Sequence, residues 1–217
     1  MQPVGPEALG WFPNKIESMD DFRKLRFRAP PGMVGAAYNE IGVAAVAMGG
    51  ADILPALEKG AIDAAEWCCP QPDSVFGFQK VLKHYYLQGL HQVTVNADFY
   101  LNGDVYNSLS ASEKKALEVA ANASLSKSLS YRILKNGQAL KDLTENHGVI
   151  LEDTPADYFT EYMAAAKKLL EEAAAENEFF AEVWQSQKDF ADTAVPYWAG
   201  AQTSNAGLGR AHAATLK

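Results

Sequence analysis

The sequence predicts an α/β protein whose sheets are rich in parallel strands and whose carboxyl end is built from long helices. Short apolar runs alternate with amphipathic stretches over residues 25–68, and this alternation indicates strand–helix–strand crossovers rather than a β-sandwich. From residue 110 onward the chain is rich in Ala, Leu, Lys and Ser, with apolar residues at helical spacing. That spacing predicts long helices.

The amino-terminal part predicts short elements in regular order. We expect a helical turn over 19–24, a strand over 25–28, a helix over 34–41, an apolar strand over 43–48, a helix over 52–59 and a strand over 61–68. In the first strand, alternation places Leu25 and Phe27 on one face. Arg26 and Arg28 then lie on the other face.

The helix after Gly49 carries its own start and stop signals. Asp52 fits an N-cap, Pro55 fits the first turn, where a missing N–H costs nothing, and Gly60 fits the position after the helix end. The apolar run that follows delivers Glu66 and Trp67 to the carboxyl edge of the sheet. Open α/β folds bind their ligands at that edge.

The middle of the chain is punctuated by prolines. After Pro70 and Pro72 we expect a helix over 75–84. Residues 85–101 have mostly β-type sequence, and we interpret them as a hinge strand that crosses between two parts of the protein.

Two long helices are expected in the last third. The first ends at Asn146 and opens on Ser110-Ala-Ser-Glu113, which is a capping-box pattern. A short strand over 149–151 follows. The second helix starts at Thr154-Pro155 and is expected to break near Asn177.

Composition and charge narrow the range of functions. The 217 residues are 48% apolar and 21% charged, which is ordinary for a globular protein. The net charge of −8, without any basic stripe, argues against a nucleic-acid partner. An acidic protein that binds an anion needs a local positive group, so a carboxylate site should centre on one or two buried arginines or on a metal ion.

The two cysteines and the chain ends add weaker signals. Cys68 and Cys69 are adjacent; they cannot join distant segments, and a disulfide between neighbours demands a strained ring. We expect them to be small buried residues. No stretch is long enough for a transmembrane helix, and the start lacks the pattern of a signal peptide, which taken alone indicates a cytoplasmic protein. The Gly- and Ala-rich tail from Gly200 onward is expected to fray.

One segment carries a family resemblance. Ala-Leu-Glu-Lys-Gly at residues 56–60, followed by Ile-Asp-Ala-Ala-Glu-Trp at 62–67, resembles the solute-binding proteins of tripartite ATP-independent periplasmic (TRAP) transporters. The likeness is to the branch that binds 2-oxo acids, or the mannitol and chloroaromatic type. It implies a two-lobed fold like that of type II periplasmic binding proteins, with an incomplete first lobe. It also implies that the sequence is the carboxyl-terminal portion of a longer, exported periplasmic protein whose signal peptide lies upstream.

The resemblance suggests a division of the chain. We expect a ligand-binding lobe with crossover strands over 1–85, a hinge strand and helical return over 86–153, and a long helix with a tail over 154–217.

Arg28 is the first candidate site residue. The segment from Asp21 to Arg28 resembles the family pattern Asp-Leu-Lys-Gly-Leu-Lys-x-Arg, in which the last arginine grips the carboxylate of the ligand. A guanidinium binds a carboxylate through two hydrogen bonds and stays charged when desolvated. Lys24 replaces the usual glycine. The alternative is a surface arginine in a salt bridge.

Glu66 and Trp67 match the dipeptide with which the family holds a cation, through the carboxylate and a main-chain oxygen. The third metal ligand of the family falls on Gln92 in Gly89-Leu-His-Gln92, where the usual turn is Gly-Trp-Trp-Glu. Oxygen ligands of this kind suit Na⁺ or Ca²⁺. His91 could line the pocket, but a solvated or core position is the expected one.

Glu7 is the remaining candidate for ligand binding. Residues 5–12 resemble the family pattern Gly-x-Gln-x-Gly-Gly-Trp-Phe, and Glu7 stands where the family has Gln. A second carboxylate favours Ca²⁺ over Na⁺. The alternative is a loop carboxylate in water.

The resemblance therefore implies a binding protein, not an enzyme. It would capture a small organic carboxylate, a 2-oxo or hydroxy acid, for the membrane subunits of a TRAP transporter, and a homodimer is possible. One alternative is a metal-dependent lyase or hydrolase with Glu66 as base, although the sequence contains no catalytic motif that supports it. Another is a helical interaction module over 110–195.

Overall fold

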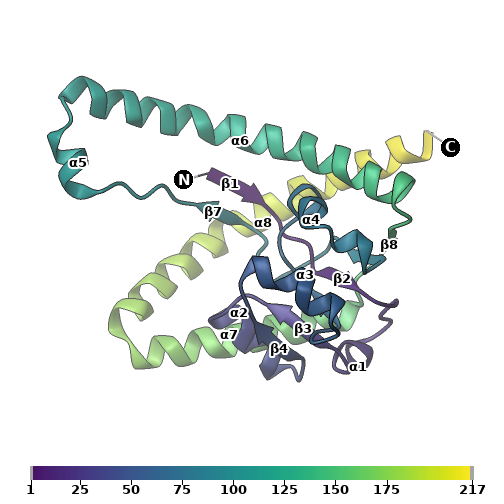
Figure 1. Cartoon of the computed structure of the whole chain (residues 1–217). Helices are drawn as coiled ribbons and strands as arrows, with labels where there is room; N and C mark the ends of the chain where they lie inside the picture. Colours follow the sequence, from purple (N-terminus) through teal and green to yellow (C-terminus); the bar gives the residue numbers. More distant parts are fainter. Residues whose placement is uncertain (1, 216–217) are drawn as a thin grey trace. The chain divides into compact units, whose positions relative to one another are not determined.

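The computed structural model describes residues 2–215 (Figure 1). The chain forms two compact units, one ending at Ala166 and the other beginning at Lys167. Among the described residues, no helix combines the length and the apolar character needed to cross a membrane.

The first unit is built on a six-stranded sheet in the order β4-β3-β5-β2-β6-β8. The strands are β2 (Gly10–Phe12), β3 (Arg26–Ala29), β4 (Ala44–Ala47), β5 (Ala64–Ala65), β6 (His84–Tyr86) and β8 (Ile150–Glu152). β3 runs parallel to β4 and β5, and β6 runs parallel to β8, whereas β2 is antiparallel to both of its neighbours. The sheet is thus mixed and mostly parallel, which confirms the predicted α/β class.

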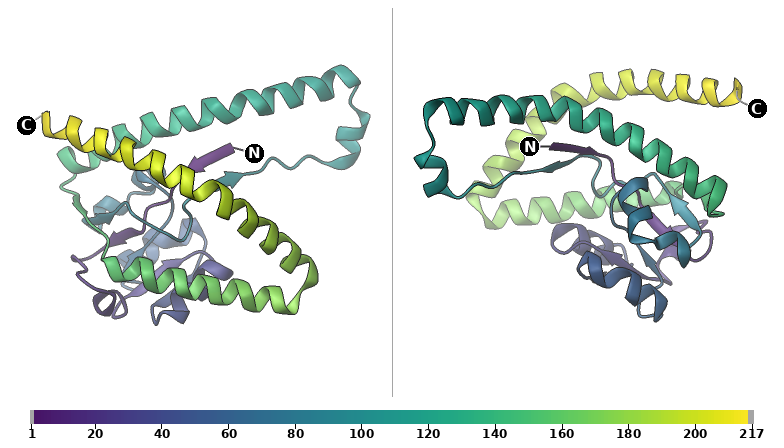
Figure 2. Two further views of the ribbon diagram at one scale, coloured as in Figure 1. Left: turned by 180° about the vertical axis from the view of Figure 1, so that it is seen from behind. Right: turned by 45° about the horizontal axis from the view of Figure 1, so that its top comes forward.

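Short helices connect these strands, and a separate two-stranded ribbon joins β1 (Gln2–Gly5) to β7 (Val95–Ala97). The short helices are α1 (Met19–Phe22), α2 (Met33–Glu40), α3 (Gly50–Glu58), α4 (Pro70–Phe76), the 3₁₀ turn η1 (Phe78–Lys80) and α5 (Gly103–Ser108). β1 lies against the long helix α6 (Ala111–Asn146), which is unbroken in both views of Figure 2.

The core lies on both faces of the sheet. Adjacent residues of β2 point to opposite faces, so Trp11 and Phe12 enter different clusters. Trp11 stacks on its cross-strand neighbour Tyr85 with ring centroids 4.2 Å apart. Phe12 packs with Phe27 and other aromatic rings of the opposite face.

The centre of the sheet depends on one glycine. Gly10 has φ +131°, and a Cβ atom there would lie 2.5 Å from the main-chain oxygen of Ala65. Only glycine allows β2 to approach β5 so closely. This approach brings the segments before β2 and after β5 together.

The predicted capping box is confirmed. The Ser110 hydroxyl accepts from the main-chain N–H of Glu113, and the Glu113 carboxylate accepts from that of Ser110, at the start of α6. The break near Asn177 is also confirmed, since α7 (Ala156–Glu176) ends there and α8 (Glu178–Thr215) begins.

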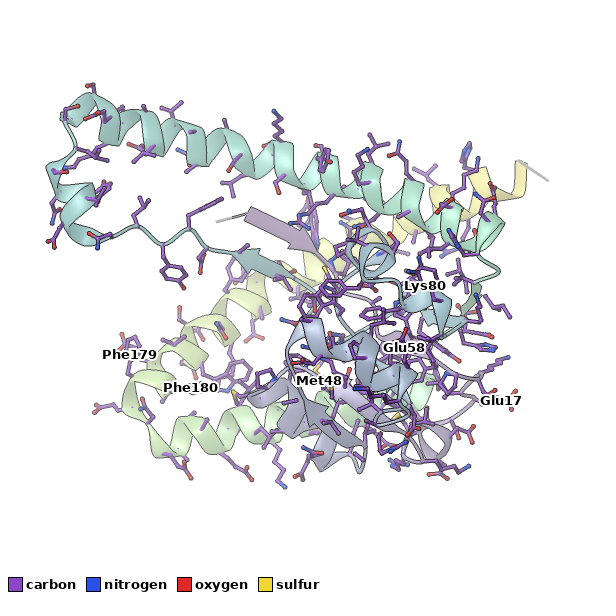
Figure 3. The ribbon with its side chains drawn as sticks, in the orientation of Figure 1. Glu17, Met48, Glu58, Lys80, Phe179 and Phe180 are labelled. Carbon is purple, nitrogen blue, oxygen red and sulfur yellow. The ribbon has the colours of Figure 1, made fainter. Side chains whose placement is uncertain are left out.

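The second unit consists of the end of α7 and α8. The Asn177 side chain accepts from the main-chain N–H of Phe180 at 2.8 Å and so caps the new helix. Trp184 donates to Glu171 at 3.0 Å across this corner. Phe179 remains exposed there, next to Phe180 (Figure 3).

Several sequence predictions about elements were wrong. Asp52 lies in the first turn of α3 without capping it, because the N-cap is Gly49. Pro55 lies inside the same helix instead of in its first turn. Gly60 does take the left-handed conformation expected after the helix, with φ +65°.

The segments on either side of α4 also differ from expectation. The helix expected over 75–84 ends at Phe76, because Gly77 adopts φ +88° and stops it. Residues 85–101 form two separate strands, β6 and β7, in different sheets, instead of one hinge strand. The tail beyond Gly200 is helical to Thr215 instead of frayed.

The apolar strand expected over 43–48 is an edge strand. β4 pairs only with β3 in the sheet order, and its residues are exposed or half-buried. The apolar composition of β4 therefore does not mean that its residues are buried.

Candidate functional site

The candidate site lies where three segments of the first unit meet. Arg28 is on β3, and its register partner on the parallel strand β5 is Ala65, so Glu66 follows directly beside it. The Glu66 main-chain N–H donates to the Arg28 oxygen at 3.2 Å. Glu7 enters from the segment before β2, where the next residue, Ala8, donates to the main-chain oxygen of Cys68 at 2.7 Å.

Arg28 is buried, at 5% exposure, and thus is not a surface arginine. Its Nη1 donates to the Glu66 carboxylate and, at 3.1 Å, to the Glu66 main-chain oxygen. Nε and Nη2 donate to the oxygen of Met48, at 3.2 and 3.1 Å. Met48, labelled in Figure 3, follows β4. The guanidinium also lies over the Trp67 ring, 5.2 Å from its centroid.

A group of three acceptors lies next to this ion pair. The side chains of Glu7, Glu66 and His91 are buried. Each offers one atom that could bind a metal ion, and these three atoms lie within 4.8 Å of one another. His91 Nε2 is 3.5 Å from Glu66 Oε2 and 3.6 Å from Glu7 Oε2. Both separations are longer than a hydrogen bond. Glu7 Oε2 and His91 Nε2 have no hydrogen-bond partner among the described residues.

A tyrosine pair holds the other side of His91. Its Nδ1 is 3.2 Å from the Tyr38 hydroxyl, which is 3.2 Å from the hydroxyl of Tyr158. Tyr158 in turn accepts from the main-chain N–H of Leu90. Ligating histidines commonly have their second nitrogen held in this way.

The charges of the site are coupled. Burial of the ring lowers the pKa of His91, but the attraction of the nearby Glu66 and Glu7 carboxylates for the protonated ring outweighs burial, and the pKa is raised above its ordinary value. Two carboxylates facing one arginine leave a net negative charge when His91 is neutral. A cation among Glu7, Glu66 and His91 would balance it, and the unpartnered buried atoms fit such an ion.

A further carboxylate lies behind the site. Asp73, on α4, is fully buried and accepts from Trp11 at 2.9 Å, from Tyr85 at 3.0 Å and from the Cys68 main-chain N–H at 3.0 Å. Burial raises its pKa to about 7, against the lowering effect of these donors. Asp73 therefore fixes the start of α4 behind Glu66 and Trp67.

The two remaining predicted site residues are Gln92 and Trp67. Gln92 accepts the main-chain N–H of Glu7 at 3.0 Å through its own main-chain oxygen, and its residue is half-buried. The Trp67 ring packs on the Phe76 ring, with the two ring centroids 4.9 Å apart. It also lies against Gly50, where an added Cβ would be 2.5 Å from the indole. The metal-binding roles predicted for Gln92 and Trp67 stay predictions.

Sequence reasoning gave His91 only as a residue that could line the pocket, and it did not single out Asp73. His91 was expected to be solvated or in the core, and it is buried, with its ring aimed at Glu7 and Glu66. Its position one residue before Gln92, in the turn expected to hold a metal ligand, was the available signal.

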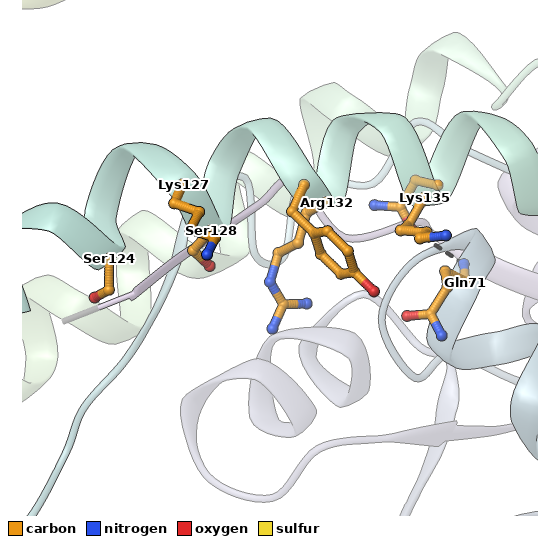
Figure 4. Close-up of a pocket in the computed structure, with 8 residues that line it drawn as sticks. Gln71, Ser124, Lys127, Ser128, Arg132 and Lys135 are labelled. Carbon is orange, nitrogen blue, oxygen red and sulfur yellow. Dashed lines mark hydrogen bonds between the residues drawn. The ribbon is translucent and has the colours of Figure 1, made fainter.

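A separate groove runs along one face of α6 (Figure 4). It has a volume of about 360 Å³ and contains none of the residues above. Its lining residues are Gln71, Ser124, Lys127, Ser128, Tyr131, Arg132, Lys135 and Asn136.

Comparison with known proteins decides the family. Residues 8–177 match the family model described as bacterial extracellular solute-binding protein, family 7. The chain belongs to this family. Family 7 members bind solutes, and the enzyme alternative is set aside on this ground. The protein is accordingly extracytoplasmic.

A curated relative is similar over much of the chain. The monocarboxylate 2-oxoacid-binding periplasmic protein of Nostoc sp. is 31% identical over 192 residues, which are 86% of this chain and 51% of that protein. The chain thus spans about half the length of this relative.

Solved structures of TRAP solute-binding proteins share the fold. One from Bordetella bronchiseptica RB50, a dimer with copurified calcium and picolinate, is 26% identical with a TM-score of 0.86, and the match covers 100% of this chain and 64% of that one. One from Pseudoalteromonas atlantica T6c, with bound sodium and pyruvate, is 28% identical with a TM-score of 0.84, covering 95% and 62%. One from Colwellia psychrerythraea, with bound calcium and pyruvate, is 29% identical with a TM-score of 0.85, covering 96% and 63%.

Proposed function

We propose that this family 7 protein captures a small 2-oxo acid such as pyruvate, together with a cation, for a TRAP-type transporter. The observation that carries the proposal is the buried group of Glu7, Glu66 and His91 beside Arg28. Relatives at 28% and 29% identity hold pyruvate with sodium or calcium, which supports the same chemistry here.

Arg28 would bind the carboxylate of the acid. A guanidinium has five N–H donors, and four hydrogen bonds are accounted for by Glu66 and Met48. One N–H of Nη2 is left, and a ligand carboxylate would compete with Glu66 for Nη1. Arg28 is suited to this exchange because it remains charged in a buried site.

Glu7, Glu66 and His91 would hold the cation, and Trp67 and Gln92 could add main-chain or amide oxygens to it. When bound, the cation would supply positive charge to the two carboxylates and to the acid. Calcium and sodium both occur in relatives, and the second carboxylate, Glu7, favours a divalent ion.

The larger architecture is also part of the proposal. A closed cleft requires two lobes that move together on a hinge, as in type II periplasmic binding proteins. We propose that this chain supplies one lobe and an incomplete part of the other, with divisions near residues 85 and 153. Membrane subunits of a TRAP transporter would receive the solute. A second copy of the chain is a possible partner, since one relative is a dimer.

Calorimetric titration of pyruvate tests the proposal. In calcium we expect a single binding event, and after removal of calcium by a chelator the affinity should fall at least tenfold. Equal heats with and without the chelator, or pyruvate recovered as a different compound, would contradict it. Mass spectrometry of small molecules that copurify with the protein would identify the natural acid.

A further inference from the structure

We propose that Cys68 and Cys69 form a reversible disulfide with each other, which makes this pair a redox-sensitive modification site beside the solute site. The two Sγ atoms are 2.9 Å apart, and both cysteines are free thiols in the structure. Cys69 is buried and Cys68 is half-buried, so Cys68 is the sulfur that an oxidant reaches first.

The contact between the two sulfurs sets the order of the exchange. The Cys69 sulfur is 2.9 Å from the Cys68 sulfur, so it is placed to attack a mixed disulfide formed at Cys68.

The compartment favours oxidation. Extracytoplasmic proteins face oxidising conditions, in which disulfides form and persist. The sequence contains two cysteines in total, so neither has another partner within the chain. The oxidant we propose is a disulfide, R–S–S–R, such as oxidised glutathione or a thiol oxidoreductase.

The reaction balances in two exchange steps. Cys68 Sγ attacks one sulfur of R–S–S–R as it loses its proton, forms a mixed disulfide and releases R–S⁻, which takes that proton. Cys69 Sγ then attacks Cys68 Sγ and displaces the second R–S⁻, which takes the Cys69 proton. The two thiols lose two electrons and two protons, and the oxidant becomes two R–SH molecules.

Strain should keep this disulfide reducible. Consecutive Cα atoms are held about 3.8 Å apart by the peptide bond, whereas disulfides usually join Cα atoms about 4.4–6.8 Å apart. Strained disulfides have higher reduction potentials and are the labile ones.

The pair is connected to the solute site through its backbone. The Cys68 N–H donates to Asp73, and its oxygen accepts from Ala8, the neighbour of Glu7. Trp67 and Glu66 precede Cys68 directly. Closing the ring would therefore shift the segments that carry both carboxylates. This effect on affinity rests on the proposed function, whereas the disulfide itself does not.

Thiol alkylation of the unfolded protein tests the disulfide. The protein is equilibrated with excess oxidised glutathione and then denatured in the presence of iodoacetamide, which alkylates free thiols. The mass of the intact chain is then measured by mass spectrometry. We expect no alkyl group and a mass lower by two hydrogen atoms, and two alkyl groups after reduction. The matched controls Cys68→Ser and Cys69→Ser should each keep one thiol that cannot form an intramolecular disulfide. Two alkyl groups without reduction, a stable glutathione adduct, or a disulfide-linked dimer would each overturn the proposal.

A second measurement separates this inference from the proposed function. Calcium and pyruvate affinities are compared between the oxidised and reduced protein, and we expect at least a threefold difference that Cys68→Ser abolishes. Equal affinities would overturn the coupling to the site. Absence of binding in both forms would contradict the proposed function and leave the disulfide result standing.

Discussion

Arg28 and Glu66 are mutual partners at the ends of two adjacent parallel strands. The Arg28 Nη1 atom donates both to the Glu66 carboxylate and to the Glu66 main-chain oxygen, the latter at 3.1 Å. Their side chains are 6% and 1% exposed. The pair therefore joins β3 to β5, and in the proposed function it also supplies the charges for solute binding.

Removing the arginine should cost both stability and affinity. Arg28→Ala leaves Glu66 buried without its cation, and breaking a buried ion pair costs about 3–5 kcal/mol. Arg28→Lys keeps the positive charge but cannot make the bidentate hydrogen bonds of a guanidinium to a carboxylate. We expect it to fold and to bind pyruvate at least tenfold more weakly by calorimetry.

The exposed neighbour provides the control for this experiment. Arg26 pairs with Asp63 and its side chain is 49% exposed, so Arg26→Ala should lower stability far less than Arg28→Ala does and leave binding intact. Wild-type affinity in Arg28→Lys would refute the assignment of Arg28 to the carboxylate.

Cation binding should depend on Glu7 and His91. Glu7→Gln removes a charge from the group, and His91→Phe removes its nitrogen donor. Each should weaken calcium binding by about tenfold or more, because ligand charge and number set calcium affinity. Pyruvate affinity should fall in parallel, since in the proposed function the acid and the cation meet at Glu66.

Glu17→Gln is the matched control, because the Glu17 side chain is 77% exposed. Calcium titration of all three variants checks the prediction. If Glu7→Gln bound calcium as the wild type does, the cation would have to lie elsewhere.

Asp73 should make stability depend on pH. Its pKa rises from 3.8 to about 7 in the folded protein because of burial. The folded state then holds this proton more tightly than the unfolded state, so the stabilisation is fully present below about pH 4 and is lost as pH rises to about 7. A shift of this size corresponds to about 4 kcal/mol.

Urea unfolding across this pH range measures the effect. Asp73→Asn cannot ionise, so its free energy of unfolding should lack this fall, although losing an acceptor lowers its stability overall. The difference between wild type and variant is the quantity to compare. A difference that is constant with pH would show that Asp73 does not titrate in this window.

Gly10 should be irreplaceable at the centre of the sheet. An added Cβ would lie 2.5 Å from the Ala65 oxygen, and overpacking of this kind costs about 1–3 kcal/mol beyond backbone strain. Gly60→Ala is the control: Gly60 also has positive φ, with no atom within 4 Å of the added Cβ. The free energy of unfolding of Gly60→Ala should fall by about 1–2 kcal/mol, the cost of a left-handed backbone for alanine. Equal losses in the two variants, by chemical denaturation, would exclude the steric argument.

The local signals in the sequence predicted local structure well. The capping box at Ser110, the left-handed Gly60 and the break at Asn177 each depend on neighbouring residues alone. Other local signals failed, since Asp52 does not cap α3 and Gly77 ends α4 early, and burial was not predicted where tertiary contacts decide it. Pro55 is tolerated inside α3, and the apolar residues of β4 lie at a sheet edge.

The candidate site divides in the same way. The sequence by itself determined that Arg28 and Glu66 lie near the ends of strands, because strand periodicity places Arg28 there and the apolar run at residues 61–65 places Glu66 there. Only the tertiary structure decided that His91 faces Glu7 and Glu66, since turns far apart in the chain meet through the pairing of β2 with β5 and β6. Burial then made these groups interact strongly, because charges removed from water must find partners in whatever the fold brings near them.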